Sequence, residues 1–343
     1  MTNTQLTLRE IFSLAEEALI ASGASAGAAS SLATAVTAAE RDGIRSHGLI
    51  YVPIYCEHLT CGKVNAAAEP VVLSQEGSTV VVDADCGFAH PAIDIGFDEL
   101  RPLAKALGCA ALTVRNSYNC GVLGYHVERL SEDGLVAIGF TNAPASIAPA
   151  GGQKPVVGTN PVALAVPGVS GQAAFVLDQS ASVVAKSEIM TRAREGRSIP
   201  EGWALDAEGQ TTTDPEQALK GSMAPSGGYK GFGIGLLVEV MAAALSGATL
   251  GIHASPFSGT QGGPPRTGQC FLALSPDAFS SGTFDDRIQA LTQAIATQGE
   301  ARLPGSRRLG HRQRSESDGV AVDQSLVDRI HSITAGNDTQ LVL

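Results

Sequence analysis

The chain has 343 residues, of which 44% are hydrophobic and 17% are charged, so it can bury one large core or two domains that share an interface. Its formal net charge of −11 argues against nucleic acids and anionic membranes as partners, because neutralising phosphates requires a basic face. A local basic site for a small anion stays compatible with this charge.

The first 75 residues are predicted to be helical. Thr7 and Glu10 form a capping-box pattern ahead of an apolar periodicity typical of a first helix. An alanine-rich second helix is expected over residues 25–41, and a third over residues 49–59. Because acidic residues precede any long apolar run, the N-terminus does not resemble a secretory signal peptide.

Between residues 76 and 275 the pattern changes to short apolar runs typical of buried strands. The predicted strands are 79–83, 110–114, 135–140, 163–166, 175–177 and 270–274. Helices are expected between them near 91–107 and 122–133. The apolar stretch 232–248 contains Glu239 and is expected to be a buried helix, not a membrane span. The predicted fold class is α/β, a central sheet with helical segments at both ends of the chain.

Residues 276–343 are polar and partly helical, and we expect them to pack with the N-terminal part. The chain thus divides into a helical segment 1–75, an α/β core 76–275 and this C-terminal segment. Its six cysteines form no CxxC pair, and no Cys/His group has the spacing of a zinc site. We therefore expect no metal, and free thiols in a reducing, cytoplasmic location.

Two motifs combine residues suited to catalysis or anion binding. In Ser46-His47-Gly48, a hydroxyl beside a histidine in a turn can hold the imidazole in one tautomer; a surface or capping histidine is the alternative. In residues 227–233, glycines open an apolar helix, so free backbone N–H groups and Lys230 could bind an anion. Close helix packing is the alternative role for these glycines.

Two further segments place polar groups at the ends of predicted strands. Gly158-Thr159-Asn160-Pro161 could present side-chain donors to a ligand, with a plain turn as the alternative. Asp178-Gln179-Ser180 ends an apolar strand, where ligands of α/β proteins often bind; a helix N-cap is the alternative. The sequence contains no GxGxxG between strand and helix, no P-loop and no GxSxG, so it lacks the Rossmann dinucleotide fingerprint.

Taken in order, these motifs resemble the type-2 malate/L-lactate dehydrogenase family. That family includes ureidoglycolate and sulfolactate dehydrogenases, diketogulonate reductases, and reductases of pyrroline- and piperideine-2-carboxylate. The resemblance extends over nearly the whole chain. Its pieces are Ser46-His47-Gly48, Asn116-Ser117, Gly151-Gly152, Gly158-Thr159-Asn160-Pro161, residues 199–206, Thr213-Asp214-Pro215 and residues 227–231.

The resemblance implies a non-Rossmann NAD(P)-dependent enzyme for a small carboxylic acid, usually an intertwined homodimer. His47 matches the proton donor, and Ser46 and Glu188 match relay positions of the piperideine reductases. Thr159 matches a substrate-contacting position. The implied cofactor contacts are Asn119, Cys120, Gly121, Val122, Leu123, Asp178, Gln179, Ser180, Lys230, Arg302, Gly305, Arg307 and Arg308.

Two departures from the family pattern concern the substrate. Family members usually carry Arg four residues after the histidine, suited to bidentate carboxylate binding, and here that residue is Tyr51. Many also carry a second His in Asn-Ser-x-His-Phe-Gly, where this chain has Asn119 followed by Cys120. We therefore expect Thr159 and Tyr51, with Arg45, to hold the substrate carboxylate.

The expected reaction is hydride transfer between the nicotinamide and C2 of the acid, with His47 as the proton donor in reduction. Arg302, Arg307 and Arg308 favour NADP over NAD, because guanidinium groups suit a 2′-phosphate; a solvated basic patch is the alternative. The leading substrates are 3-sulfolactate/3-sulfopyruvate and malate/oxaloacetate. A cyclic-imine reductase, favoured by the acid at position 188, and a non-catalytic binding protein are the alternatives.

Overall fold

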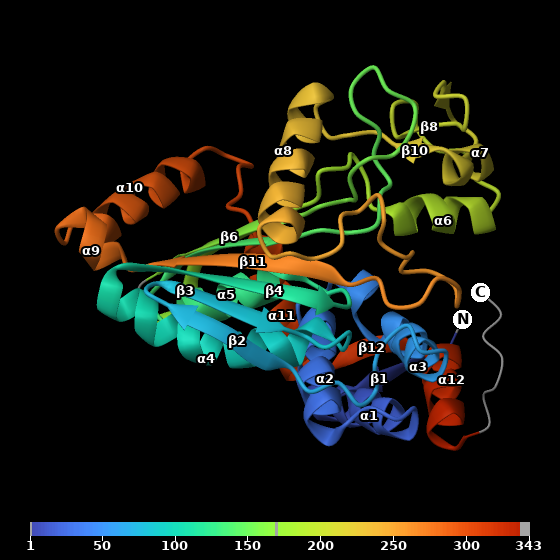
Figure 1. The fold of residues 1–343 in the computed structure, drawn as a ribbon, viewed down its shortest axis with the longest axis horizontal. Helices are drawn as coiled ribbons and strands as arrows, with labels where there is room; N and C mark the ends of the chain where they lie inside the picture. Colours follow the sequence, from blue (N-terminus) through green and yellow to red (C-terminus); the bar gives the residue numbers. More distant parts are fainter. Residues whose placement is uncertain (1, 169–170, 337–343) are drawn as a thin grey trace.

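A mixed sheet of seven strands, in the order β2-β3-β4-β11-β5-β6-β7, forms the centre of the molecule (Figure 1). The computed structural model describes residues 2–168 and 171–336. The strands are β2 (Val71–Glu76), β3 (Thr79–Asp83), β4 (Cys109–Ser117), β5 (Val136–Thr141), β6 (Val162–Pro167), β7 (Ala173–Gln179) and β11 (Thr267–Leu274).

Only β3 and β4 run parallel among the neighbours in this sheet, and the other pairs are antiparallel. A doubly wound Rossmann sheet is mostly parallel, so the structure confirms the predicted non-Rossmann α/β class. All six predicted strands are present, most of them longer than expected. Strand β2 is absent from the prediction; it lies at the edge of the sheet, and nearly all of its side chains are exposed.

Helices cover both faces of the sheet. Helices α4 (Ala89–Leu107) and α5 (Leu123–Glu132) pack on one face, and α8 (Tyr229–Glu239) with a following π-helical turn (Val240–Ala244) packs on the other (Figure 1). A large apolar cluster lies between the sheet and helices α4 and α5. Its members include Phe97, Leu100, Leu112, Val127, Leu130 and Phe271.

The prediction of a buried helix over residues 232–248 is wrong in one respect. The helix packs on the sheet through Val238 and Ala242, but its opposite side is bare. Exposed apolar residues on that side are Ile234, Leu236, Leu237, Val240 and Leu245. A single sheet covers only one side of a helix that is apolar all round. No helix in the described part of the chain is long and apolar enough to cross a membrane.

The two ends of the chain share a second apolar cluster. Helices α1 (Leu8–Ala21), α2 (Ala26–Arg41) and α3 (Val52–Thr60) pack with β12 (Val320–Asp323) and α12 (Gln324–Thr334). The cluster includes Ile11, Leu19, Leu32, Tyr55, Val322 and Ile330. Strand β1 (Asn3–Leu6) pairs antiparallel with β12, and the predicted capping box at the start of α1 is confirmed.

Smaller elements surround the sheet. They are helices α6 (Lys186–Arg194), α7 (Pro215–Lys220), α9 (Pro276–Ser280), α10 (Phe284–Ala296) and α11 (Ser306–Asp318), and strands β8 (Ala204–Leu205), β9 (Thr211–Thr212) and β10 (Ser222–Met223). The three short strands form their own sheet beyond α8 (Figure 1). Helices α9 and α10 follow β11 and extend away from the body without a buried residue.

Candidate active site

The predicted proton donor lies in a short 3-10 turn, Arg45–His47, between α2 and α3. Ser46 Oγ is 3.0 Å from His47 Nδ1, so Nε2 is the ring nitrogen left for a ligand. The half-buried imidazole lies parallel to the ring of Tyr51, with centroids 6.1 Å apart and planes 4° apart. The structure therefore brings His47, Ser46 and Tyr51 together.

Glu40, which the sequence did not single out, fixes the turn after His47. Its buried Oε1 accepts the backbone N–H of Leu49 at 2.7 Å. A Cβ on Gly48 would overlap this carboxylate, so any other residue there would displace the Glu40 side chain. Burial raises the pKa of Glu40, while the Leu49 hydrogen bond and the charge of Arg45 lower it in part.

A second carboxylate, Asp178 at the end of β7, acts on His47 through its charge. Burial lowers the pKa of His47, and the negative charge of Asp178 partly offsets that effect. Burial raises the pKa of Asp178, while the N–H of Gly124 and the charges of Arg308 and His47 lower it in part. The sequence had predicted only a cofactor contact for Asp178.

Glu188, the predicted relay acid, lies on α6. Its Oε1 accepts a hydrogen bond from Arg192 Nε at 3.0 Å, one turn further along the same helix. Arg192 in turn lies over the ring of Trp203, 4.8 Å from its centroid. Within the described residues Glu188 has no hydrogen bond to Ser46 or His47, so its relay role stays a prediction.

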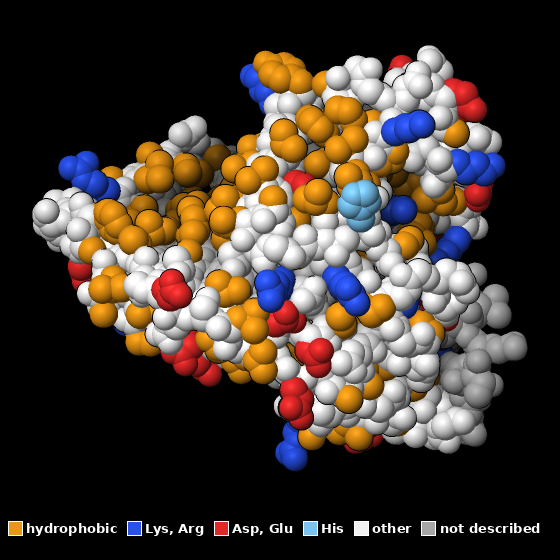
Figure 2. Space-filling model, in the orientation of Figure 1, with side chains coloured by type: hydrophobic (Ala, Val, Ile, Leu, Met, Phe, Trp, Pro, Cys, Tyr) orange, Lys and Arg blue, Asp and Glu red, His pale blue; other side chains and the backbone are white. Residues whose placement is uncertain are grey.

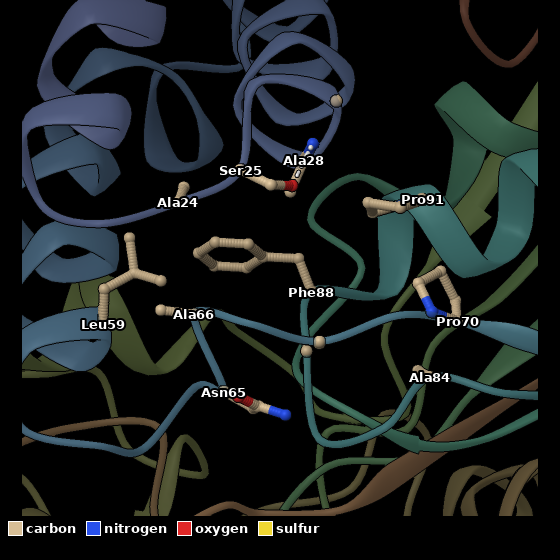
Figure 3. Close-up of a pocket in the computed structure, with 13 residues that line it drawn as sticks. Ala24, Ser25, Ala28, Leu59, Asn65, Ala66, Pro70, Ala84, Phe88 and Pro91 are labelled. Carbon is tan, nitrogen blue, oxygen red and sulfur yellow. Dashed lines mark hydrogen bonds between the residues drawn. The ribbon is translucent and has the colours of Figure 1, made fainter.

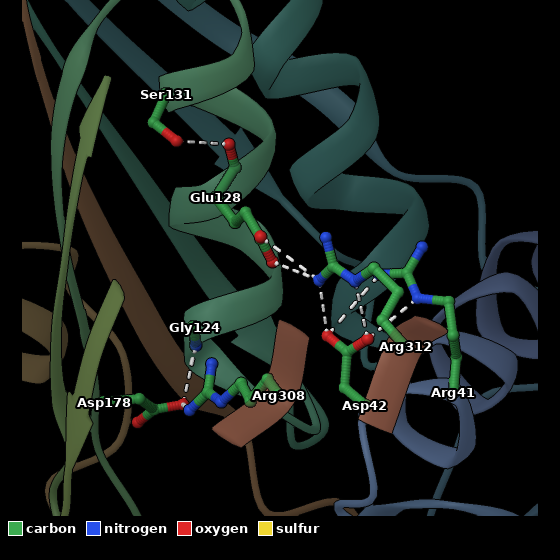
Figure 4. Close-up of polar contacts among 8 residues, drawn as sticks. All are labelled: Arg41, Asp42, Gly124, Glu128, Ser131, Asp178, Arg308 and Arg312. Carbon is green, nitrogen blue, oxygen red and sulfur yellow. Dashed lines mark hydrogen bonds and ion pairs between the residues drawn. The ribbon is translucent and has the colours of Figure 1, made fainter. Parts of the chain in front are cut away.

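The end of β7 brings together three of the predicted cofactor segments. Asp178 Oδ2 accepts the Gly124 N–H at the start of α5 at 2.7 Å, and Arg308 of α11 lies 3.9 Å from the same oxygen (Figure 4). The N–H of Val176 donates to Pro304 O at 3.4 Å. The segment before α11 therefore runs along the edge strand towards the N-terminus of α5.

The same strand end also contacts the two remaining predicted segments. Thr159 O accepts hydrogen bonds from Ser180 Oγ at 2.9 Å and from the Ala181 N–H at 2.8 Å. The Ser226 N–H donates to Ala181 O at 2.8 Å, which places the glycine-rich loop before α8 beside them. Lys230, in the first turn of α8, is exposed.

These segments fit an extended, phosphate-bearing cofactor. A Cβ on Gly124 would lie 2.7 Å from Arg308 Nη1, so glycine permits the close approach of α5 and α11. Arg302 and Arg307 are exposed and form no ion pair with any described residue, which leaves both guanidinium groups for an anion.

Some predicted contacts can be made only through the backbone or have another partner. The side chains of Cys120 and Leu123 are buried, so those residues could offer a cofactor only main-chain groups. Arg45, predicted to hold the substrate, donates from Nη2 to Ala321 O at 3.1 Å. Gln179 is exposed, and Val122 is half-buried at the start of α5.

Tyr51 and Asn119, the two departures from the pattern expected from the sequence, both carry uncharged donors. Burial raises the pKa of Tyr51 to about 12, so its hydroxyl stays protonated at neutral pH. Asn119 Oδ1 accepts the Gly121 N–H at 3.1 Å and the Tyr55 hydroxyl at 3.4 Å. That orientation leaves the Asn119 amide NH₂ group as a donor.

An ion-pair network missed by sequence reasoning anchors α11. Arg312 donates to Asp42 at 2.7 and 3.0 Å and to both oxygens of Glu128 at 3.1 Å (Figure 4). Asp42 caps α2 and Glu128 belongs to α5, so one guanidinium joins three helices. The three residues are far apart in sequence and no local pattern links them, which is why the network could not be predicted.

A pocket lined by residues from 24–28, 59–70 and 84–91 contains none of the predicted site residues (Figure 3). It is lined mainly by small apolar residues, with Asn65 and Ser25 as polar members. We assign no catalytic role to it. No group of three or more His, Cys, Asp or Glu side chains in the described ranges could hold a metal ion.

Comparison with known proteins places the chain in a family. Residues 6–331 match the malate/L-lactate dehydrogenase family. The chain is 43% identical to the (2R)-3-sulfolactate dehydrogenase (NADP(+)) of Chromohalobacter salexigens, over 95% of this chain and 97% of the relative. It is 37% identical to the Delta(1)-pyrroline-2-carboxylate reductase of Agrobacterium fabrum, over 95% and 96%.

A solved structure agrees with these relatives. The crystal structure of delta1-piperideine-2-carboxylate reductase from Pseudomonas syringae pvar. tomato has a TM-score of 0.90 at 32% identity, covering 96% of this chain and 99% of the other. The fold, the order of the sequence motifs and the length of chain that these relatives match all indicate the same family. The chain belongs to the malate/L-lactate dehydrogenase family and is an NAD(P)-dependent oxidoreductase.

Proposed function

We propose that the chain interconverts a small 2-hydroxy acid and its 2-oxo acid with NADP(H), the acid carrying a second anionic or polar group. 3-Sulfolactate/3-sulfopyruvate is the leading pair, followed by malate/oxaloacetate. The observation that carries this proposal is the 43% identity, over 95% of the chain, to a protein named (2R)-3-sulfolactate dehydrogenase (NADP(+)). The uncharged donors Tyr51 and Asn119 support it, since they suit a polar substrate better than a flat apolar ring.

His47 is the proposed proton donor in reduction. When bound, the reduced cofactor supplies the hydride that adds to C2 of the oxo acid. The proton for the developing alkoxide oxygen comes from His47 Nε2, because Nδ1 faces Ser46 Oγ. In oxidation the neutral imidazole takes the hydroxyl proton back. Thr159 and Tyr51, with Arg45, are the proposed carboxylate contacts, and Glu188 is the proposed relay acid from the family resemblance.

The cofactor is proposed to lie along the end of β7. Arg302, Arg307 and Arg308 would hold the 2′-phosphate, for which guanidinium groups are suited. Lys230 and residues 119–123, which lead into α5, would face its other phosphates and the nicotinamide end. This arrangement is supported by the contacts that Asp178 makes with Gly124 and Arg308.

The deciding assay follows NADPH oxidation with 3-sulfopyruvate, oxaloacetate, pyruvate and pyrroline-2-carboxylate under one set of conditions. We expect kcat/KM to be highest for an oxo acid with a second anionic group. A preference of about tenfold or more for the imine, or about 1.4 kcal/mol in transition-state binding, would overturn the substrate assignment. The same assay with NADH tests the cofactor preference.

A cyclic-imine reductase is the second candidate. It is favoured by the pyrroline-2-carboxylate reductases among the relatives, at 34–37% identity, and by the acidic residue at position 188. His47 would then donate its proton to the imine nitrogen. Glu188→Gln compares the two candidates: a much larger loss in imine reduction than in oxo-acid reduction would favour the imine reductase.

We also propose a homodimer. In α10 the apolar residues Phe284, Ile288, Leu291 and Ile295 recur at helical spacing on a helix without a buried residue. Hydrophobic side chains gather on the surface between α10 and α8 (Figure 2). A second copy of the chain would cover both. Sedimentation of the wild type as a dimer, and of Leu291→Asp as a monomer, is expected; a monomeric wild type at micromolar concentration contradicts the proposal.

A further inference from the structure

Glu239, the last residue of α8, is a buried carboxylate without a cationic partner. Its exposed fraction is 6%, and no Lys, Arg or His of the described residues forms an ion pair with it. Instead, Oε1 accepts the Gly251 N–H at 2.6 Å and Oε2 accepts from Asn160 Nδ2 at 2.7 Å. Both oxygens of this carboxylate therefore accept hydrogen bonds from the protein.

Asn160 connects Glu239 to the turn before β6. The residue is fully buried, and its amide also donates to Gly235 O at 2.9 Å and accepts the Ala143 N–H at 3.0 Å. Its backbone is left-handed, with φ of +33°, which costs energy for a residue with a side chain. The hydrogen bonds to α8 therefore hold a turn that would not adopt this shape by itself.

Thr159 precedes Asn160 and is fixed from the other side. Its carbonyl accepts hydrogen bonds from Ser180 Oγ and the Ala181 N–H at the end of β7. Its half-buried hydroxyl forms no hydrogen bond with any described residue. The side chain is therefore held between α8 and β7 with its hydroxyl left for a ligand.

We infer that Glu239 is a positioning residue of the active site, which acts through Asn160 to aim the Thr159 hydroxyl at the substrate. This inference rests on the proposed function, in which Thr159 contacts the substrate carboxylate. An apolar residue at position 239 would pack α8 on the sheet but could not orient Asn160. The buried carboxylate is costly without a counter-ion, and its hydrogen bonds to the turn account for its presence.

Glu239→Gln tests the inference, because glutamine has the same shape but must point its NH₂ group at a donor, either Asn160 Nδ2 or the Gly251 N–H. We expect KM for the acid to rise about tenfold, the cost of a small misplacement, while kcat and NADPH affinity change less than about threefold. Glu208→Gln, an exposed substitution between β8 and β9, is the matched control and should behave as wild type.

A double-mutant cycle with Thr159→Ala separates positioning from general damage. If Glu239 acts through Thr159, Glu239→Gln adds little to KM once the hydroxyl is gone. Additive effects, equal losses in acid KM and NADPH affinity, or a lower Tm with unchanged KM would each overturn the inference. The assay uses the acid that the wild type reduces fastest, so a wrong substrate assignment leaves the ratios readable.

Glu239→Asp covers the case in which Glu239→Gln does not fold. The shorter side chain keeps the charge but withdraws from Asn160, and KM for the acid should rise by about threefold or more. A normal KM for Glu239→Asp contradicts the inference. If Thr159→Ala alone leaves KM for the acid unchanged, Thr159 does not contact the substrate. That result contradicts the proposed substrate contact and not the hydrogen bond between Glu239 and the turn.

Discussion

Two regions of the molecule are held together by different forces. The first is the layer of helices that the two ends of the chain form, and the second is the junction at the end of β7. Ile11, Leu19, Leu32 and Ile330 are fully buried in the first, which is an apolar cluster made mostly of helices. At the end of β7, hydrogen bonds and charges join α5, α11 and the Thr159 turn. Burial of apolar surface stabilises the fold, whereas the polar junction holds segments in the places that a cofactor and substrate require.

This difference predicts that substitutions in the two regions have different readouts. Changes at the end of β7 should alter kinetic constants with little loss of stability. Changes to the Arg312 network, which joins α11 to α2 and α5, should lower the free energy of unfolding more than they alter the kinetic constants. His47 borders both regions, because its turn follows α2 and its charge responds to Asp178.

His47→Ala should have the largest effect on activity, lowering kcat/KM by roughly 10²–10⁴, the usual contribution of a general acid. Its turn is shaped by Glu40, so we expect the fold and NADPH binding to survive. Steady-state kinetics together with NADPH fluorescence titration measures both. A variant within about threefold of the wild type would remove His47 from the mechanism.

Arg312→Ala should have the largest effect on stability, about 3 kcal/mol, because it leaves the largely buried Glu128 unpaired and leaves Asp42 with Arg41 alone. Burial would raise the pKa of Asp42, but hydrogen bonds from Arg312 and Arg41 outweigh it and lower that pKa. The stabilisation is thus present at neutral pH and is lost as acid protonates Asp42. Because the pKa of Asp42 lies below its ordinary value of 3.8, urea unfolding at pH 7 and pH 3 should show the variant's deficit shrinking at the lower pH.

Arg314→Ala, an exposed change on the same helix, is the control for that measurement and should unfold like the wild type. An equal deficit in both variants would show that α11 is held by something other than the Arg312 network.

The double variant Arg302→Ala, Arg307→Ala should raise KM for NADPH about tenfold and leave KM for NADH nearly unchanged, since only NADPH carries the 2′-phosphate. Both guanidinium groups are exposed and the fold should not suffer. Parallel losses with the two cofactors would assign these arginines to another part of the cofactor.

Asp178→Asn should have a smaller effect, a several-fold loss of kcat/KM in reduction near neutral pH. Asp178 raises the pKa of His47, so its removal lowers that pKa and moves the basic limb of the pH profile to lower pH. Asparagine can still accept the Gly124 N–H. Glu188→Gln is the comparison: a larger shift in Glu188→Gln than in Asp178→Asn would assign the partner role to Glu188.

Local patterns predicted the parts of this molecule that local physics determines. The capping box at Thr7, the six apolar strands and the histidine turn could each be recognised in a few neighbouring residues. The exposed side of α8 could not be predicted from the sequence. An apolar residue reads the same in a sequence whether the sheet, a partner or nothing covers it.

The candidate site shows the same limit. Family motifs indicated His47 and Thr159, but the contacts between Asp178 and Gly124, or Glu239 and Asn160, join residues dozens of positions apart. Such pairs follow from strand order and helix packing, which no single sequence pattern encodes. The sequence therefore predicts only a cofactor contact for Asp178, and it shows Glu239 only as a charged residue within an apolar helix.

A crystal structure with NADPH and a non-reducible oxo-acid analogue such as oxamate tests the central claim most directly. The account predicts the cofactor along the end of β7, with its 2′-phosphate on Arg302, Arg307 or Arg308. The analogue should lie within about 3 Å of His47 Nε2, at hydrogen-bond distance. A cofactor bound elsewhere, for example in the pocket around Asn65, or an analogue out of reach of His47, would contradict it.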